Sequence, residues 1–122
     1  MNPHSGYQYL YFQRRAYELG TWIQEKLQAV SLENYTDATN IQAKIEKHQA
    51  FEADVAAKSN EIGVLDSDME LIRWKRYQNV CKQCLDGLHR LLDLLRSKLA
   101  EKGRMLQQAK LNISSYLKHN YF

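Results

Sequence analysis

Two segments decide the fold of this chain: NIQAKIEKHQAFEADVAAKSNEI at residues 40–62 and the earlier WIQEKLQ at residues 22–28. In both segments the apolar residues recur at steps of three or four, which places them along one face of a helix. Neither segment contains a catalytic motif. The pattern therefore predicts two helices that pack along one face, in a chain that supports, spaces or docks and does not catalyse.

The composition extends this prediction to the whole chain. The sequence has 122 residues, enough for one domain, and only one proline and five glycines. Strong helix formers dominate, and alternating strand patterns are absent, so we expect an all-α fold. No apolar run approaches the ~20 residues needed to cross a bilayer. Residues 1–6 lack the pattern of a secretory signal, so we expect them to form a disordered tail and the protein to be cytoplasmic.

The net charge of +3 hides an asymmetry along the chain. Residues 1–74 carry 7 Lys+Arg against 11 Asp+Glu, whereas residues 75–122 carry 10 against 3. We expect the basic part to pair with the acidic part across a helix interface. The alternative is that the basic part attracts an acidic partner or an anionic lipid.

The apolar spacing predicts three helices, at about residues 8–31, 39–72 and 80–118. Thr36 or Asp37 is the expected N-cap of the second helix. His48 lies among apolar neighbours, where a histidine is usually a core-edge residue with one hydrogen bond. The residues expected to form the structural core are Phe12, Trp22, Ile45, Phe51, Val55, Leu88, Leu92, Leu95 and Leu99.

The turn between the second and third helices is open at this stage. Residues 73–79 are the preferred position. Residues 65–67 are an alternative, because the sequence SDME at 67–70 fits a capping box. A third possibility is one uninterrupted helix, which would favour a domain-swapped dimer over a monomer. Gly103, inside the third helix, marks either a weak point or a close helix contact.

The chain resembles the spectrin repeat, a left-handed antiparallel three-helix bundle, and is similar to the first complete repeat of α-spectrin. Trp22 corresponds to the family's tryptophan in the first helix, whereas Leu92 stands where the family has a second tryptophan. Trp74 falls in a divergent segment. The resemblance is carried by YFQRRAYELGTWIQEKLQ (11–28), ENYTDATNIQAKIEKHQAFEADVAAKSNEI (33–62), VLD (64–66), LHR (88–90), DLL (93–95) and LAEKGRMLQQA (99–109).

The resemblance implies a structural role. It suggests one repeat at residues 7–114 and the start of a truncated following helix at 115–122. Function would be that of a spacer and protein-interaction module in a cytoskeletal rod at the cell cortex, associated with actin. The implied partners are neighbouring spectrin repeats and spectrin-associated cytoskeletal proteins.

Other functions have weaker support in the sequence. Cys81 and Cys84 form a CxxC pair near His89, but without a second pair they fit an apolar stripe better than a zinc or redox site. Residues 90–110 form a basic amphipathic helix of the kind that binds calmodulin or anionic membranes. No nucleic-acid-reading module and no catalytic motif are recognisable, so we expect no nucleic-acid partner, no catalytic residues, no cofactor and no metal.

Overall fold

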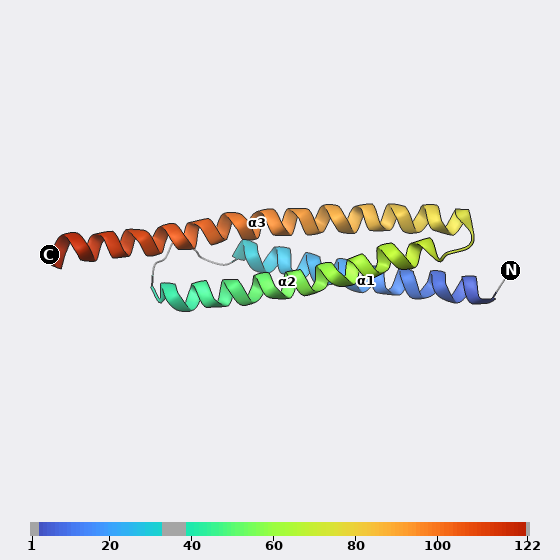
Figure 1. The fold of residues 1–122 in the computed structure, drawn as a ribbon, viewed down its shortest axis with the longest axis horizontal. Helices are drawn as coiled ribbons and strands as arrows, with labels where there is room; N and C mark the ends of the chain where they lie inside the picture. The colour runs from blue at the N-terminus through green and yellow to red at the C-terminus, as the bar shows by residue number, and fades with distance from the viewer. Residues whose placement is uncertain (1–2, 33–38, 122) are drawn as a thin grey trace.

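The computed structural model describes residues 3–32 and 39–121, and in these residues it contains three antiparallel helices (Figure 1). They are α1 (Pro3–Leu32), α2 (Ile41–Glu70) and α3 (Lys75–Tyr121). The all-α three-helix bundle predicted from the sequence is confirmed. Helix α1 begins at Pro3, inside the segment of residues 1–6 that was expected to form a disordered tail. Proline suits the first turn of a helix because its missing N–H has no partner there in any case.

The connection between α1 and α2 ends at Asn40, the N-cap of α2. The backbone of Asn40 has a φ of 55° and a ψ of 42°, in the left-handed region, which asparagine tolerates better than most residues. The side chain of Asn40 makes no capping hydrogen bond. The predicted caps Thr36 and Asp37 lie outside the described residues.

The turn between α2 and α3 lies at residues 71–74, and so overlaps the preferred window of 73–79 only at its start. The N–H groups of Leu71 and Ile72 donate to the carbonyls of Asp68 and Met69, at 3.0 and 3.1 Å, which tightens the last turn of α2. The side-chain amide of Gln78 then donates to the carbonyl of Ile72 at 2.6 Å. These bonds satisfy the backbone of a turn that has neither glycine nor proline.

The two alternatives for this turn are wrong. Helix α2 continues through residues 65–67, and the Ser67 hydroxyl donates to the Gly63 carbonyl at 3.4 Å instead of capping a new helix. A single uninterrupted helix is excluded because α2 ends at Glu70 and the chain folds back. Ile72 continues the apolar spacing of α2 and is buried, although it already lies in the turn. For this reason the sequence pattern placed the helix end two residues too late.

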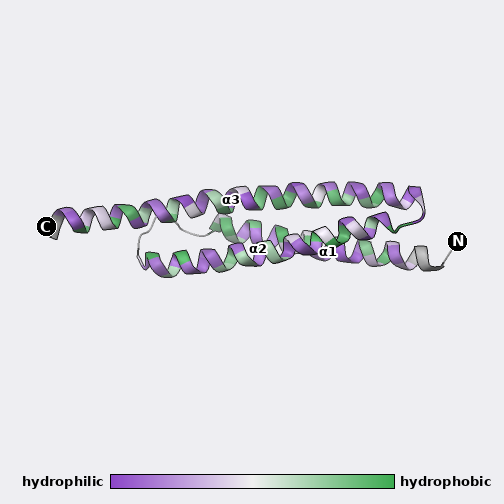
Figure 2. Ribbon diagram, viewed as in Figure 1, coloured by the Kyte–Doolittle hydropathy of each residue, from purple (hydrophilic) through white to green (hydrophobic). Residues whose placement is uncertain are grey.

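The core runs along the axis of the bundle. Figure 2 shows apolar residues recurring between hydrophilic ones along each ribbon, as expected for helices that bury one face. A second, smaller cluster of Ile45 and Leu106 lies where α2 and α3 pair beyond the main core. The main cluster contains Phe12, Ala16, Leu19, Ile23, Val30, Val55, Ile62, Leu65, Ile72, Cys81, Leu85, Leu88, Leu92, Leu95 and Leu99.

Helix α3 extends past the other two helices at its C-terminal end (Figure 1). Its 47 residues span roughly 70 Å, against roughly 45 Å for the 30 residues of α1 and of α2. The end of α3 therefore projects from the bundle. No helix in the described ranges 3–32 and 39–121 combines the length and apolar character needed to span a membrane.

Candidate functional site

The residues predicted to form the core divide into two groups in the structure. Trp22 and Phe51 are only partly buried and pack against the main cluster from its edge, which corrects their expected place in the interior. The others are buried: Phe12, Ile45, Val55, Leu88, Leu92, Leu95 and Leu99.

Two lysines lie over the rings of Trp22 and Phe51 at this edge. The Lys26 ammonium lies 5.5 Å from the Trp22 ring centroid and 5.4 Å from that of Phe51. The Lys58 ammonium lies 5.5 Å from the Trp22 centroid. Cation–π attraction favours such positions. Apolar spacing alone does not predict this arrangement, since it does not show where the lysines will lie.

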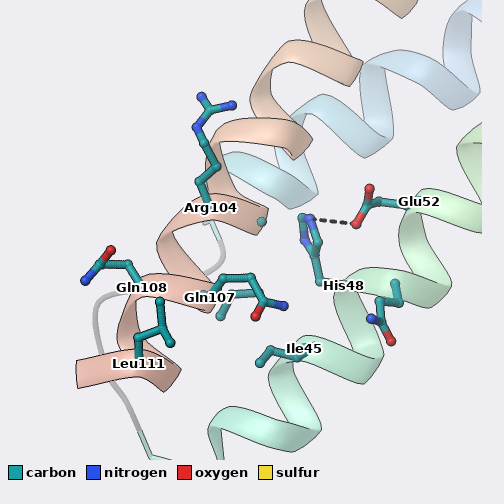
Figure 3. A pocket seen from close by; sticks show the side chains of 10 residues that line it. Ile45, His48, Glu52, Arg104, Gln107, Gln108 and Leu111 are labelled. Atoms are coloured by element: carbon teal, nitrogen blue, oxygen red, sulfur yellow. Dashed lines mark ion pairs between the residues drawn. The ribbon is translucent and has the colours of Figure 1, made fainter. Parts of the chain in front are cut away.

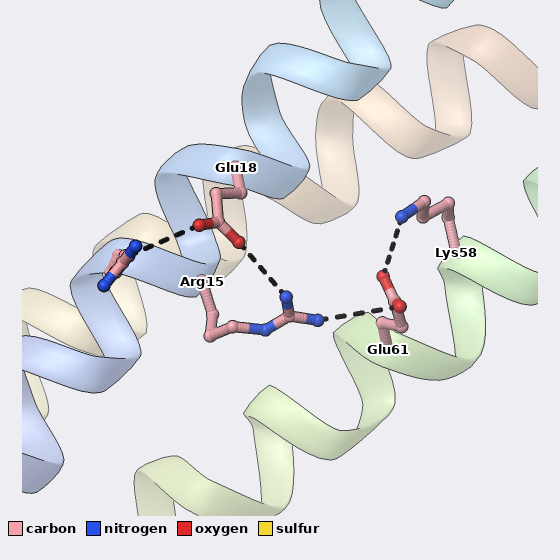
Figure 4. Close-up of polar contacts among 5 residues, drawn as sticks. Arg15, Glu18, Lys58 and Glu61 are labelled. Carbon is pink, nitrogen blue, oxygen red and sulfur yellow. Dashed lines mark hydrogen bonds and ion pairs between the residues drawn. The ribbon is translucent and has the colours of Figure 1, made fainter.

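A charged seam joins α1 and α2 next to these rings (Figure 4). We define the polar seam as Arg15, Glu18, Lys58 and Glu61. The guanidinium of Arg15 lies 3.1 Å from Glu18 and 3.6 Å from Glu61, bridging the two helices. Glu61 Oε2 lies 3.2 Å from Lys58 Nζ, although without hydrogen-bond geometry. Ion pairs exposed to this degree contribute about 0–1 kcal/mol each, so the seam aligns the helices more than it stabilises them.

His48 and Gly103 make a close contact between α2 and α3. Figure 3 shows His48 and its ion pair with Glu52. His48 is 4% exposed, and its Nε2 lies 3.0 Å from the Leu99 carbonyl and 3.3 Å from a Glu52 oxygen. Since a carbonyl only accepts, Nε2 carries the proton in this hydrogen bond. A Cβ at Gly103 would lie 3.2 Å from Nε2. The glycine therefore leaves the space that lets the imidazole reach the backbone of α3.

The sequence identified His48 and Gly103 separately but did not bring them together. The expectation of a core histidine with a hydrogen bond agrees with the contact, as does the possibility of a close helix contact at Gly103. His48 lies 23 residues before the turn at 71–74, whereas Gly103 lies 29 residues after it, so the position of the turn alone does not pair them. Their contact depends on the register between α2 and α3, which apolar spacing within one helix does not report.

Two polar contacts join α2 to the basic part of the chain in α3, and the predicted pairing of lysine and arginine with the acidic part stays a prediction. His89 Nε2 lies 3.1 Å from both carboxylate oxygens of Asp66, and the Arg96 guanidinium donates to the Ser59 hydroxyl. All of these groups are at the surface or half-buried, so solvent weakens their contribution.

The two cysteines have different environments. Cys81 is fully buried, and this burial, with a smaller contribution from Cys84, raises the pKa of its thiol to about 11. A thiol with a raised pKa is a poor nucleophile and a poor metal ligand. Cys84 is exposed, so it does not lie on the buried apolar stripe of α3 as expected. Its neighbour Leu85 is buried there instead. Within residues 3–32 and 39–121, no group of three or more His, Cys, Asp or Glu is arranged to hold a metal ion.

The C-terminal part of α3 has an apolar face that the bundle does not cover. Leu111, Tyr116 and Leu117 are 63%, 64% and 46% exposed, and Ile113 is half-buried. Ile113, Tyr116 and Leu117 continue the helical spacing of the buried part of α3, whereas Leu111 lies to one side of it. Helices α1 and α2 do not reach this level of α3 (Figure 1). Leu10, near the start of α1, is exposed as well.

The three-helix arrangement and its buried stripe agree with a comparison to known families. The model of the spectrin repeat family matches residues 7–108. This chain belongs to the spectrin repeat family. The spectrin repeat family is structural and non-enzymatic, which agrees with the catalytic motifs missing from the sequence.

Individual relatives show the same relationship. This spectrin repeat is 36% identical over 106 residues to "Spectrin alpha chain, erythrocytic 1" of Mus musculus, covering 80% of the chain and 4% of the relative. It is 36% identical over 94 residues to "Spectrin beta chain" of Drosophila melanogaster, covering 75% and 4%. It is 31% identical over 101 residues to "Spectrin beta chain, erythrocytic" of Mus musculus, covering 81% and 5%. The chain thus spans about one-twentieth of the length of these relatives or less.

Proposed function

We propose that this chain is a spacer and interaction unit of a spectrin-type cytoskeletal rod, with residues 7–114 forming one repeat. Residues 115–122 would begin the first helix of a following repeat. Its partners would then be neighbouring repeats and spectrin-associated cytoskeletal proteins, in the cytoplasm at the cell cortex.

The observation that carries this proposal is the uninterrupted course of α3 from Lys75 to Tyr121. The helix leaves the bundle without a break, and beyond that point its apolar residues are exposed. A second set of helices packed around this extension would cover Ile113, Tyr116 and Leu117 just as α1 and α2 cover the earlier stripe. The extension therefore supports a continuous helical connection between units.

The mechanism of such a unit is mechanical. Units in a linear array contact only their neighbours. The stability of the array is therefore approximately the sum of the stability of each unit and of the interfaces between neighbouring units. A shared helix makes the connection stiff and couples the unfolding of adjacent units. A broken helix would leave them flexible and independent.

A tandem protein tests this proposal. Residues 1–114 are joined directly to residues 7–122, and the control carries Gly-Pro-Gly at the junction, which interrupts helices. We expect the direct fusion to have the larger maximum dimension in small-angle X-ray scattering and a single unfolding transition in urea. In the control, we expect a smaller maximum dimension and a lower urea concentration at the midpoint of unfolding. Identical scattering and unfolding of the two proteins would contradict a helical connection.

The alternative that residues 90–110 bind calmodulin or an anionic membrane is not supported by the structure. The apolar residues of this segment are already used inside the bundle, and a peripheral partner could reach them only if α3 detached. The buried members are Leu92, Leu95, Leu99 and Leu106.

A further inference from the structure

Cations and apolar side chains gather at the turn between α2 and α3. We define the turn patch as Leu71, Arg73, Trp74, Lys75 and Arg76. Leu71 is 67% and Trp74 is 45% exposed, and the three cations are exposed as well. Within residues 3–32 and 39–121, none of these three cations has an ion-pair or hydrogen-bond partner. The patch therefore presents positive charge that the bundle itself does not neutralise.

The start of α1 adds aromatic residues to the same end of the bundle (Figure 1). The rings of Tyr9 and Tyr77 stack with centroids 4.3 Å apart, which fixes the start of α1 beside the start of α3. Tyr7, Leu10 and Tyr11 are 74%, 61% and 60% exposed. Since residues 7–13 contain no charged side chain, this part of α1 extends the apolar character of the turn end.

Exposed tryptophan and tyrosine beside arginine and lysine is the combination found at membrane interfaces. Aromatic rings with a polar edge favour the headgroup layer, and basic side chains are attracted by anionic lipids. The turn patch lies at the end of the rod-like bundle, whereas the grooves next to His48 and next to Leu88 lie between helices along its length. A protruding end suits a bilayer surface better than it suits a partner helix, which needs a groove.

We propose that the turn patch docks this protein onto membranes that contain anionic phospholipid. Trp74 and Leu71 would enter the headgroup layer, and Arg73, Lys75 and Arg76 would pair with lipid phosphates and carboxylates. The bundle would then stand with its turn end on the bilayer and the free end of α3 pointing away (Figure 1). This proposal goes beyond the rod function, and within a rod it requires that no preceding repeat covers the turn end.

Two acidic residues set the expected strength of this binding. Asp68 and Glu70 precede the patch in the last turn of α2, with Asp68 half-buried and Glu70 exposed. They lower the local positive charge, so binding should need a membrane rich in anionic lipid. It should also weaken as salt screens the exposed charges.

Cosedimentation with vesicles tests the electrostatic part. The vesicles contain equal parts of phosphatidylserine and phosphatidylcholine, or phosphatidylcholine alone. We expect the unaltered chain to bind the first kind at low salt and not the second. Arg73→Gln/Lys75→Gln/Arg76→Gln should bind roughly 100-fold more weakly, at about fivefold for each basic residue.

The matched control removes the same number of charges from the other end of the bundle. Arg104, Lys110 and Lys118 are exposed, and Arg104→Gln/Lys110→Gln/Lys118→Gln has the same net charge as the turn variant. We expect this control to bind nearly as well as the unaltered chain. Equal losses in the two triple variants would overturn the proposal, because binding would then follow net charge alone. Failure of the unaltered chain to bind would also overturn it and would point to an acidic protein surface instead.

Tryptophan fluorescence tests the orientation. Trp22→Phe leaves Trp74 as the only tryptophan, and Trp74→Phe leaves Trp22. Brominated lipids quench rings that reach the bilayer, so we expect strong quenching of Trp74 and almost none of Trp22. Quenching of Trp22 with Trp74 unaffected would place the membrane on the side of the bundle and overturn the proposal. Circular dichroism of each variant checks that the bundle is intact.

Discussion

Helix α3 and the polar seam show two different ways of joining helices in one small bundle. The inner stripe of α3 is apolar along its length, with Leu85, Leu92 and Leu95 all 3% exposed or less. The seam between α1 and α2 instead joins Arg15 to Glu61 at 3.6 Å, in groups that are 33% and 39% exposed. The same chain therefore uses burial along one interface and screened charge along another.

This difference suggests that the buried stripe of α3 stabilises the bundle, whereas the polar seam aligns α1 with α2. Burying an apolar side chain contributes roughly 1.5–3 kcal/mol, whereas an exposed ion pair contributes about 0–1 kcal/mol. Stability should therefore depend on α3, and the polar seam should respond to salt with little effect on the free energy of unfolding. Four substitutions test this contrast, beginning with the largest expected effect.

Replacing a leucine of the α3 stripe should have the largest effect. Leu95 is 0% exposed, so Leu95→Ala should lower the free energy of unfolding by about 3–5 kcal/mol through lost burial and a cavity. Leu94, its neighbour in sequence, is 48% exposed and makes the matched control. Leu94→Ala should cost less than about 1 kcal/mol, since surface substitutions have small effects. Urea unfolding measures both, and similar losses would contradict the assignment of stability to the stripe.

The buried thiol of Cys81 should make stability fall at alkaline pH. Its pKa is raised from 9.0 to about 11 in the folded state, so between these values the unfolded chain loses the proton while the folded chain keeps it. The free energy of unfolding should therefore decrease by about 2 kcal/mol as the pH rises from 9 to 11. Below pH 9 the thiol is protonated in both states, and it contributes no pH dependence.

The comparison of two cysteine variants isolates this effect from the other groups that titrate in the same range. Cys81→Ala should remove this part of the alkaline decline in urea unfolding, whereas Cys84→Ala should keep most of it. A decline of the same slope in both variants would mean that Cys81 does not keep its proton in the folded state.

The contact between His48 and Gly103 predicts an unusual response to alanine. Alanine in place of a helical glycine normally stabilises by up to about 1 kcal/mol, and Gly63→Ala should do so because no atom lies within 4 Å of the added Cβ. At Gly103 the Cβ would meet His48 and displace its hydrogen bond to Leu99. We expect Gly103→Ala to be about 1–2 kcal/mol less stable than Gly63→Ala.

A double-mutant cycle in thermal or urea unfolding checks the cause. With His48→Ala already present, Gly103→Ala should no longer be harmful, because the imidazole that it displaces is gone. Equal stabilisation by Gly63→Ala and Gly103→Ala in the unaltered background would show that the close contact carries no free energy.

Much of the fold could be predicted because the stripe of α3 repeats with the period of the helix. Leu88, Leu92, Leu95 and Leu99 are buried, as the spacing indicated. The turn was harder to predict, since it contains neither glycine nor proline and is held by the side chain of Gln78. Local sequence patterns do not report a bond from a side chain to a backbone carbonyl six residues away.

The edge residues show a second limit of sequence patterns. Apolar spacing placed Trp22 and Phe51 in the interior, but their burial depends on where Lys26 and Lys58 lie in three dimensions. His48 and Gly103 are similar, because their contact depends on the register of two antiparallel helices. Periodicity identifies the buried face of one helix, whereas pairwise contacts between helices also need the register of one helix against the other.

The polar seam should give the smallest effect. Arg15→Gln removes the bridge between Glu18 and Glu61, and we expect it to lower the free energy of unfolding by less than about 1 kcal/mol. High salt should shrink this loss further, because the charges are partly exposed to solvent. Arg14→Gln is the matched control, since the Arg14 side chain is 82% exposed and pairs with Glu18 on its own helix. Urea unfolding at low and high salt measures both. A loss for Arg15→Gln that approached that of Leu95→Ala would reverse the contrast, since the charges between α1 and α2 would then stabilise the bundle as strongly as the buried stripe of α3.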